Sequence, residues 1–130
     1  MFCLSASLED YIEVIYILDQ QCFSVGITDI SSELSISKPS VTKAVKLLKS
    51  KGLLFQEKYG KINLTVEGKK VAKEIYQRHQ ILSKFLVDAL GVSKKTAEID
   101  ACKIEHILSR ETIGKIKKFL NFQKVIKKVP

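Results

Sequence analysis

The spacing of apolar residues along the chain predicts helices interrupted by one short hairpin. Residues 5–20 carry apolar side chains three or four positions apart, which is typical of an amphipathic helix. The residues of this stripe are Leu8, Tyr11, Ile12, Ile15 and Leu18. Gly26 breaks the pattern, and a short helix over residues 29–34 is expected to begin after Thr28, whose hydroxyl suits an N-cap.

A three-residue turn at residues 35–37 connects this short helix to another. Pro39 suits the first helical turn, where its missing N–H costs no hydrogen bond, and either Ser37 or Lys38 precedes it as the cap. Gly52 ends the helix. Its expected apolar stripe consists of Val41, Val45, Leu47 and Leu48. Two short helices joined by such a turn are typical of a helix-turn-helix.

Two strand-like runs, at residues 53–56 and 62–64, follow this pair of helices. The polar turn between them has Gly60 at its tip, so they predict a β-hairpin wing. A long helix is then expected from a cap at Thr65 to about residue 90, with Gly91 as its stop.

Two more helices are expected, at residues 93–108 and from Ser109 toward residue 119. Residues 115–130 hold six lysines and no acid, and both an amphipathic helix and a partly frayed tail fit them. The predicted fold is mostly α: a winged helix-turn-helix DNA-binding domain over residues 1–65, followed by an all-helical metal-binding and dimerisation domain over residues 66–130.

Positive charge gathers where the helix-turn-helix and the wing are predicted. Residues 1–36 contain six acids and no Lys or Arg, whereas residues 37–61 contain seven Lys and one acid. A solvated basic face would give the same charge, but cations clustered beside a helix-turn-helix favour phosphate binding. We therefore expect a double-stranded DNA operator as partner. The residues expected to contact it are Ser37, Lys38, Pro39, Ser40, Thr42, Lys43, Lys46, Lys58 and Lys61.

Composition narrows the setting in which the protein works. No apolar run approaches the roughly 20 residues of a membrane span. The opening Met-Phe-Cys-Leu-Ser lacks the basic and apolar regions of a signal peptide. Three cysteines, at positions 3, 22 and 102, cannot all pair with one another, which fits a reduced compartment. We therefore expect a cytoplasmic protein that does not contact a membrane.

A second set of residues indicates metal binding. The run Cys102-x-x-Glu105-His106 lies in a predicted helix, where offsets of three and four place all three side chains on one face. A thiol, a carboxylate and an imidazole together suit a divalent transition metal. Two other predicted helices offer Asp10, Glu13 and His79. Each of these residues alone is more typical of a core or a solvated position, so the prediction depends on the combination.

Several stretches, in their order along the chain, resemble the diphtheria-toxin-repressor family of metal-dependent transcriptional regulators, including its short manganese-responsive branch. These stretches are residues 8–13, 15–16, 28–30, 39–43, 64–69, 78–79, 85–86 and 101–109. The resemblance covers about residues 5–120. It implies a repressor that acts as a homodimer and is not an enzyme, in the short form without the SH3-like third domain of longer members.

The resemblance also implies two adjacent metal sites. Residues that match the first site are Asp10, Cys102, Glu105 and His106. Those that match the second are Glu13 and His79, and Glu98 is a further candidate ligand. The implied cofactor is Fe²⁺ or Mn²⁺, with Co²⁺, Ni²⁺ or Zn²⁺ as substitutes in vitro.

This chain departs from both branches of the family. The manganese branch typically has Glu where this chain has Cys102. The iron branch has Met where this chain has Asp10, and a carboxylate and a histidine where it has Ser83 and Glu98. The identity of the metal, the number of ions, and whether Cys102 binds through sulfur or through its backbone carbonyl therefore stay open.

The leading hypothesis is a metal-dependent repressor controlling iron or manganese homeostasis. Because the candidate ligands come from both predicted domains, a shared cation would tie the domains together and favour the DNA-binding dimer. The alternative is a winged-helix regulator that senses an organic ligand or acts without metal. A small metalloenzyme is disfavoured, since the chain has no His-Glu-x-x-His or other hydrolytic signature.

Overall fold

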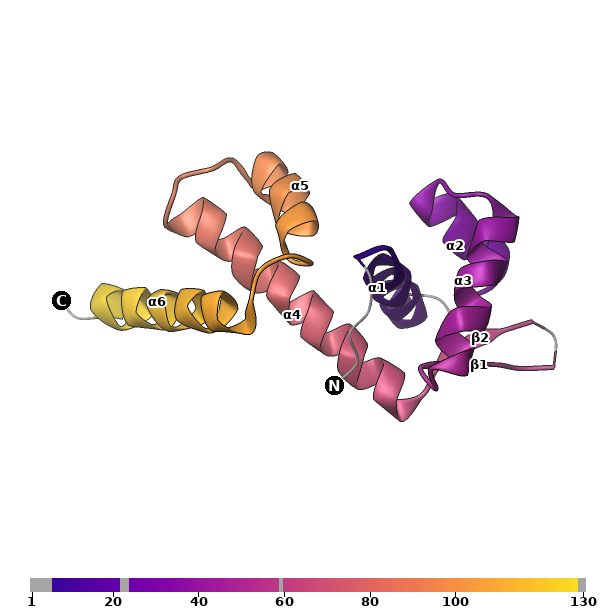
Figure 1. Ribbon diagram of the computed structural model, residues 1–130. Coiled ribbons are helices and arrows are strands. Elements are labelled where there is room, and N and C mark those ends of the chain that lie inside the picture. The colour runs from indigo at the N-terminus through magenta and orange to yellow at the C-terminus, as the bar shows by residue number, and fades with distance from the viewer. Residues whose placement is uncertain (1–5, 22–23, 59, 129–130) are drawn as a thin grey trace. The chain divides into compact units, whose positions relative to one another are not determined.

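The computed structural model of the chain describes residues 6–21, 24–58 and 60–128 (Figure 1). It divides into two compact units, Met1–Ile75 and Tyr76–Pro130. The division between these units falls within a long helix, α4 (Val66–Asp88), about ten residues beyond the domain boundary proposed from the sequence.

The first unit contains a helix-turn-helix and a hairpin. Besides the first turns of α4, it consists of α1 (Ala6–Gln21), α2 (Ile27–Leu34), α3 (Lys38–Ser50), β1 (Leu54–Gln56) and β2 (Ile62–Leu64). The two strands pair antiparallel, with Phe55 opposite Asn63. The Ile62 N–H also donates to the Val25 carbonyl at 2.8 Å, which ties the segment before α2 to the hairpin. The predicted wing is confirmed, although Tyr59 in its turn lies outside the described residues.

The predicted apolar stripes form one core in this unit. Ile12 and Ile15 of α1, Ile30 of α2 and Val41 and Leu48 of α3 are all buried in it. Burial of such side chains stabilises each by roughly 1.5–3 kcal/mol relative to exposure, so the core fixes how the helix-turn-helix packs. Leu47 is an exception: it is 46% exposed, so its predicted place in the α3 stripe is wrong.

The helix ends depend on specific hydrogen bonds. Ser37 is the N-cap of α3, and its Oγ accepts from the Ser40 N–H. This agrees with one of the two predicted caps, Ser37 or Lys38. The predicted cap of the preceding helix is wrong: α2 begins earlier, after Gly26, whose N–H donates to the Asp29 carboxylate at 2.8 Å. A carboxylate at the third helical position can accept from the N-cap N–H, which is one half of a capping box.

The start of α4 packs tightly against the hairpin. Thr65 caps the helix as predicted, since its Oγ1 accepts from the Gly68 N–H at 3.0 Å and donates to the Gly52 carbonyl at 2.7 Å. Gly68 has almost no free space: a Cβ there would lie 2.0 Å from the Leu53 carbonyl oxygen. The missing side chain of Gly68 therefore sets the approach of α4 to the hairpin.

The second unit is built from the later turns of α4, with α5 (Lys94–Ile104) and α6 (Arg110–Lys128). Phe85 and Phe119 make an edge-to-face contact with ring centroids 5.9 Å apart. Ser93 caps α5 through the Thr96 N–H, and Ser109 likewise accepts from the Thr112 N–H at the start of α6. The described part of this unit is entirely helical or irregular, in agreement with the predicted fold class.

Two details of this unit differ from the sequence predictions. The helix α5 ends at Ile104 instead of residue 108. The long helix α4 ends at Asp88 instead of about residue 90, and Leu90 beyond its end is 61% exposed. For the basic tail, the helical alternative holds through Lys128. Within the described residues, every helix is too short or too polar to cross a membrane.

Candidate DNA-binding surface and metal centre

The exposed side of α3 carries most of the residues predicted to contact DNA. Val41, Val45 and Leu48 point into the core, so the opposite face of the helix is left to solvent. The predicted DNA-contacting residues that are exposed are Ser37, Lys38, Pro39, Ser40, Thr42, Lys43, Lys46 and Lys58, while Lys61 is half-buried. The fold therefore presents the basic helix and the wing on the surface of one unit.

Several polar side chains on this surface already have partners within the protein. The Thr42 hydroxyl donates to the Lys38 carbonyl at 3.0 Å, and the Ser37 hydroxyl donates to that of Ser40 at 2.9 Å. Local bonds of this kind hold the hydroxyls in place, and each oxygen keeps further hydrogen-bonding capacity. The lysines Lys43 and Lys46 are consequently the strongest candidates for direct phosphate or base contacts.

The sequence reasoning missed a link between the recognition helix and the wing. The ammonium of Lys49, on α3, donates to Gln56 Oε1 of β1 at 3.4 Å. The amide of the same Gln56 donates to the Gly60 carbonyl in the wing turn at 3.1 Å. Gln56 thus connects α3 to the tip of the wing, a role that no spacing pattern in the sequence signals.

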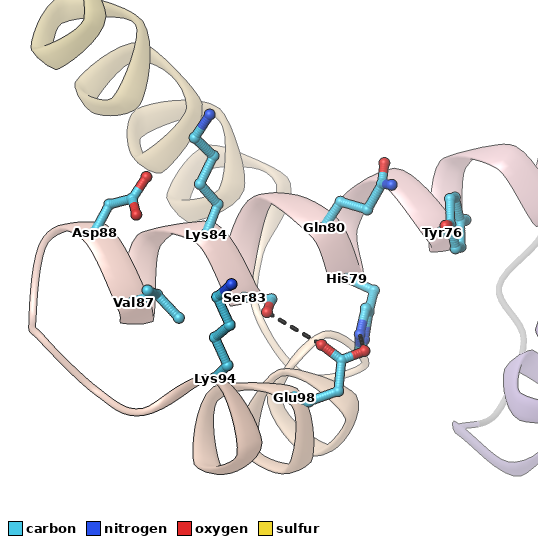
Figure 2. A pocket seen from close by; sticks show the side chains of 9 residues that line it. All are labelled: Tyr76, His79, Gln80, Ser83, Lys84, Val87, Asp88, Lys94 and Glu98. Carbon is cyan, nitrogen blue, oxygen red and sulfur yellow. Dashed lines mark hydrogen bonds and ion pairs between the residues drawn. The ribbon is translucent and has the colours of Figure 1, made fainter.

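In the second unit, His79 lies between two carboxylates. Its Nδ1 is 2.8 Å from Glu105 Oε2, and its Nε2 is 2.6 Å from Glu98 Oε1. Figure 2 shows His79 and Glu98 together, with the Ser83 hydroxyl donating to the other Glu98 oxygen at 3.2 Å. His79 and Ser83 are one helical turn apart on α4, while Glu98 comes from α5. The helix pair therefore brings three candidate polar groups to one point.

The run from Cys102 to His106 does not lie in one helix, so that part of the sequence prediction is wrong, although ligand atoms of Cys102 and Glu105 lie within 4.8 Å of each other. Cys102 lies in the last turn of α5, Glu105 is the C-cap, and His106 lies in the turn that follows. Glu105 Oε1 is nevertheless 3.4 Å from His106 Nε2, since the turn keeps the two side chains adjacent. The carboxylate and the imidazole lie together because the chain turns after the end of α5, not because they share a helix face.

The two carboxylates strongly favour the protonated form of His79. The hydrogen bond with Glu105 is the main cause, and together with Glu98 it raises the pKa of His79 from 6.5 to about 9 against the opposing effect of burial. The same contact with His79 lowers the pKa of Glu98 below its usual 4.5. At neutral pH the metal-free protein therefore holds a positive charge between these two carboxylates.

A pocket of about 440 Å³ opens beside this cluster (Figure 2). It lies between α4 and α5, entirely within the second unit, and its wall includes His79, Ser83 and Glu98. Lys84 and Lys94 also line it, so the wall carries both signs of charge. Solvent can thus reach the Nε2 side of the His79 ring.

The residues present fit a divalent cation. Glu105 is fully buried, yet among the described residues its Oε1 makes no hydrogen bond, although His106 Nε2 lies 3.4 Å away. A buried carboxylate oxygen without a donor is costly, and a bound cation is one way to satisfy it. Glu105, His79 and His106 offer oxygen and nitrogen ligands, which suit Mn²⁺, Fe²⁺ and Zn²⁺.

The other candidate ligands belong to both units. Asp10 and Glu13 lie one turn apart on α1, in the first unit, and are half-buried and buried, respectively. Cys102 is an exposed cysteine of the second unit that forms no disulfide within the described residues, whereas Cys3 and Cys22 lie outside them. Candidate ligands are thus present in each of the two units.

A winged helix-turn-helix followed by a helical unit with metal-ligand chemistry defines a class of DNA-binding regulators. Residues 3–62 match the N-terminal DNA binding domain of the iron dependent repressor, and residues 65–126 match its metal binding and dimerisation domain. The chain belongs to this family of metal-dependent transcriptional repressors, which are not enzymes.

Individual relatives agree with this assignment. The chain is 37% identical to an HTH-type transcriptional regulator of Methanocaldococcus jannaschii, over 90% of this chain and 94% of that one. It is 40% identical to the HTH-type transcriptional regulator MntR of Lysinibacillus sphaericus, over 85% and 78% of the two chains.

Solved structures give the same result for the fold. The manganese regulator SloR matches with a TM-score of 0.78 at 29% identity, over 88% of this chain and 54% of its own. The structure of ScaR with bound Zn²⁺ matches with a TM-score of 0.77 at 27% identity, again over 88% and 54%. The chain thus spans about half the length of these two proteins.

Proposed function

We propose that this protein is a cytoplasmic, homodimeric repressor that binds a DNA operator when loaded with Fe²⁺ or Mn²⁺ and thereby controls iron or manganese homeostasis. The observation that carries this proposal is the buried Glu105 carboxylate. One of its oxygens is on His79, and the other makes no hydrogen bond among the described residues and lies 3.4 Å from His106 Nε2. A metal-ligand cluster of this kind in a protein with an exposed basic helix-turn-helix supports a regulator whose DNA binding depends on a cation.

The proposed ligands come from both parts of the chain. Those of the second unit are His79, Cys102, Glu105 and His106, and those of α1 are Asp10 and Glu13. The sequence resemblance to the family supports the α1 ligands, and the side-chain cluster around Glu105 supports the others. When the ion is bound, these side chains restrict the movement of the DNA-binding domain against the dimerisation domain. The energy of such coupling is typically about 1–3 kcal/mol.

We assign the dimer contact to the second unit. The family match there includes dimerisation, and four large apolar side chains are exposed among the described residues of this unit. These are Leu90, Ile99, Ile107 and Phe119, with exposed fractions of 61%, 50%, 76% and 41%. A second copy of the chain covering such residues would remove apolar surface from water, and a twofold dimer would present two recognition helices to successive major grooves.

The second candidate function is a regulator that senses an organic ligand. The pocket beside Glu98 favours it, since its volume of about 440 Å³ and its mixed charges suit a small zwitterion. On this alternative, operator affinity is independent of metal and changes with the ligand. The metal-ligand chemistry around Glu105 favours the leading proposal.

Operator binding titrated with Mn²⁺, anaerobic Fe²⁺, Co²⁺ and Zn²⁺ tests the proposed function. We expect Mn²⁺ or Fe²⁺ to increase operator affinity, measured by fluorescence anisotropy. The double variant Lys43→Ala/Lys46→Ala is the control: it should bind metal like the parent but lose operator affinity, and its log–log salt slope should fall by about 0.9 for each lost phosphate contact. Operator affinity that no metal changes would rule out the leading proposal in favour of the alternative.

Metal affinity should depend on pH because of His79. With its pKa near 9, the ring is protonated at neutral pH and must release a proton before either nitrogen can bind metal. Because of this proton, we expect the metal dissociation constant to fall about tenfold for each pH unit between about pH 7 and about pH 8.5. Titration calorimetry in two buffers of different ionisation enthalpy measures the released protons.

The control for this prediction is His79→Gln, which should release about one proton fewer than the parent, whereas Cys102→Ser isolates any proton lost from the thiol. Equal proton release by parent and His79→Gln would contradict it. The metal-free protein should show the opposite trend in stability. Because folding raises the pKa of His79, its interaction stabilises most below pH 6.5 and is lost as pH rises through 9.

A further inference from the structure

The two nitrogens of His79 face different environments. Nδ1 faces Glu105, the carboxylate that is fully buried and adjacent to His106. Nε2 faces Glu98, whose side chain is 64% exposed on the wall of the pocket. The two nitrogens of an imidazole point in divergent directions, so the ring separates a buried side from a solvent-accessible side.

This difference determines which nitrogen is available to a cation. A neutral imidazole carries one proton, and the nitrogen without it is the ligand. Both nitrogens face carboxylates, Nε2 at 2.6 Å from Glu98 and Nδ1 at 2.8 Å from Glu105, so each can donate a hydrogen bond in the metal-free protein. When the ring releases one proton to bind a cation, Glu98 can keep the remaining proton on Nε2, whereas the Nδ1 side carries the further candidate ligands Glu105 and His106.

We propose that Glu98 is a positioning residue that holds His79 in its Nε2-protonated form and thereby directs Nδ1 to the metal. The inference rests on the proposed function, since it concerns the same metal site. A carboxylate that orients a metal-binding histidine in this way also makes the imidazole a stronger ligand. Glu98 itself stays outside the coordination shell, because a cation at Nδ1 lies on the other side of the ring.

The surroundings of Glu98 support this role. One carboxylate oxygen is on His79, and the Ser83 hydroxyl holds the other at 3.2 Å. Figure 2 shows Glu98 extending from α5 toward the α4 residues Ser83 and His79. Both carboxylate oxygens are thus engaged by α4, which fixes the carboxylate and, through it, the orientation of the ring.

Affinity for Mn²⁺, measured by competition with a chelator, tests the inference in three variants. Glu98→Ala removes the acceptor and should weaken Mn²⁺ binding about tenfold without changing the number of ions per subunit. Glu98→Gln keeps an oxygen that can accept from Nε2–H and should retain part of the affinity. Ser83→Ala, which only loosens the carboxylate, should have the smallest effect.

Nitrogen-15 NMR of the Zn²⁺-loaded protein gives a readout that a merely structural role would not change. In the parent, His79 should show a protonated Nε2 and a metal-bound Nδ1. In Glu98→Ala, the Nε2–H signal should broaden through faster exchange with solvent, and in Glu98→Gln it should be partly restored.

Three results would overturn the assignment of Glu98 while leaving the proposed function intact. Glu98→Ala that binds Mn²⁺ more tightly would mean that Glu98 competes with the metal for His79. Fewer bound ions per subunit in the Glu98→Ala variant would mean that Glu98 is a metal ligand. An unchanged Mn²⁺ affinity together with an unchanged NMR signal would mean that Glu98 does not position His79. A parent protein that binds neither Mn²⁺ nor Zn²⁺ would overturn the proposed function, and this inference with it.

Discussion

Glu105→Gln should abolish metal-dependent operator binding and leave the folded protein intact. The substitution keeps the size of the side chain and one oxygen beside His79, but it removes the negative charge from a fully buried position. Partners outside the coordination shell alone change metal affinity about 10–100-fold, so loss of a charged ligand should weaken Mn²⁺ binding by more than about 100-fold. Chelator competition measures this loss, and anisotropy measures the response of operator binding.

Glu111→Gln is the matched control for this prediction. It makes the same chemical change in the first turn of α6, at an exposed position outside the proposed ligand set. We expect it to bind Mn²⁺ and the operator like the parent. Circular dichroism of both variants checks that the helices remain. If Glu105→Gln kept a metal-dependent operator affinity within about tenfold of the parent, Glu105 would not be a ligand.

Gly68→Ala should strongly destabilise the DNA-binding unit, although it adds only one methyl group. A Cβ at this position would lie 2.0 Å from the Leu53 carbonyl oxygen, which belongs to the backbone and cannot turn aside. The helix α4 must then move away from the hairpin and break the bond between Thr65 and Gly52. Overpacking of this kind typically costs 1–3 kcal/mol or more, and we expect a loss of about 3 kcal/mol in a urea titration.

The chain offers a matched control for Gly68→Ala at Gly114 in α6, where a Cβ would meet nothing within 4 Å. Alanine is the better helix former, so Gly114→Ala should stabilise the protein by about 0.5–1 kcal/mol. A Gly68→Ala protein with the same urea midpoint as the parent would mean that α4 does not depend on this close approach.

The sequence by itself determined the order of the helices, the hairpin and the position of the basic surface. These features arise from local rules. Apolar residues at helical spacing give the stripe of α1, and the hydroxyls of Ser37 and Thr65 cap α3 and α4. The lysines Lys43 and Lys46 fall between the apolar positions of the α3 stripe, and both are exposed in the structure.

Local rules failed where a choice between near neighbours decided the result. Thr28 and Gly26 both suit the start of α2. The helix begins after Gly26 because the Asp29 carboxylate accepts a hydrogen bond from the Gly26 N–H. The pattern of residues 93–108 continued beyond the true end of α5, so it placed His106 on a helix face although His106 lies in a turn. Periodicity describes which residues share a face, but it does not fix the residue at which a helix ends.

Only the tertiary structure decided which distant groups meet. The sequence supplied His79 and Glu105 as separate candidate ligands, and the resemblance to the family added Glu98. The packing of α4 against α5 then brought Glu105 within 2.8 Å of one His79 nitrogen and Glu98 within 2.6 Å of the other. The close approach at Gly68 is likewise absent from any local pattern. Contacts between residues far apart in the chain depend on how whole elements pack, and that packing is a property of the complete core and not of any one segment.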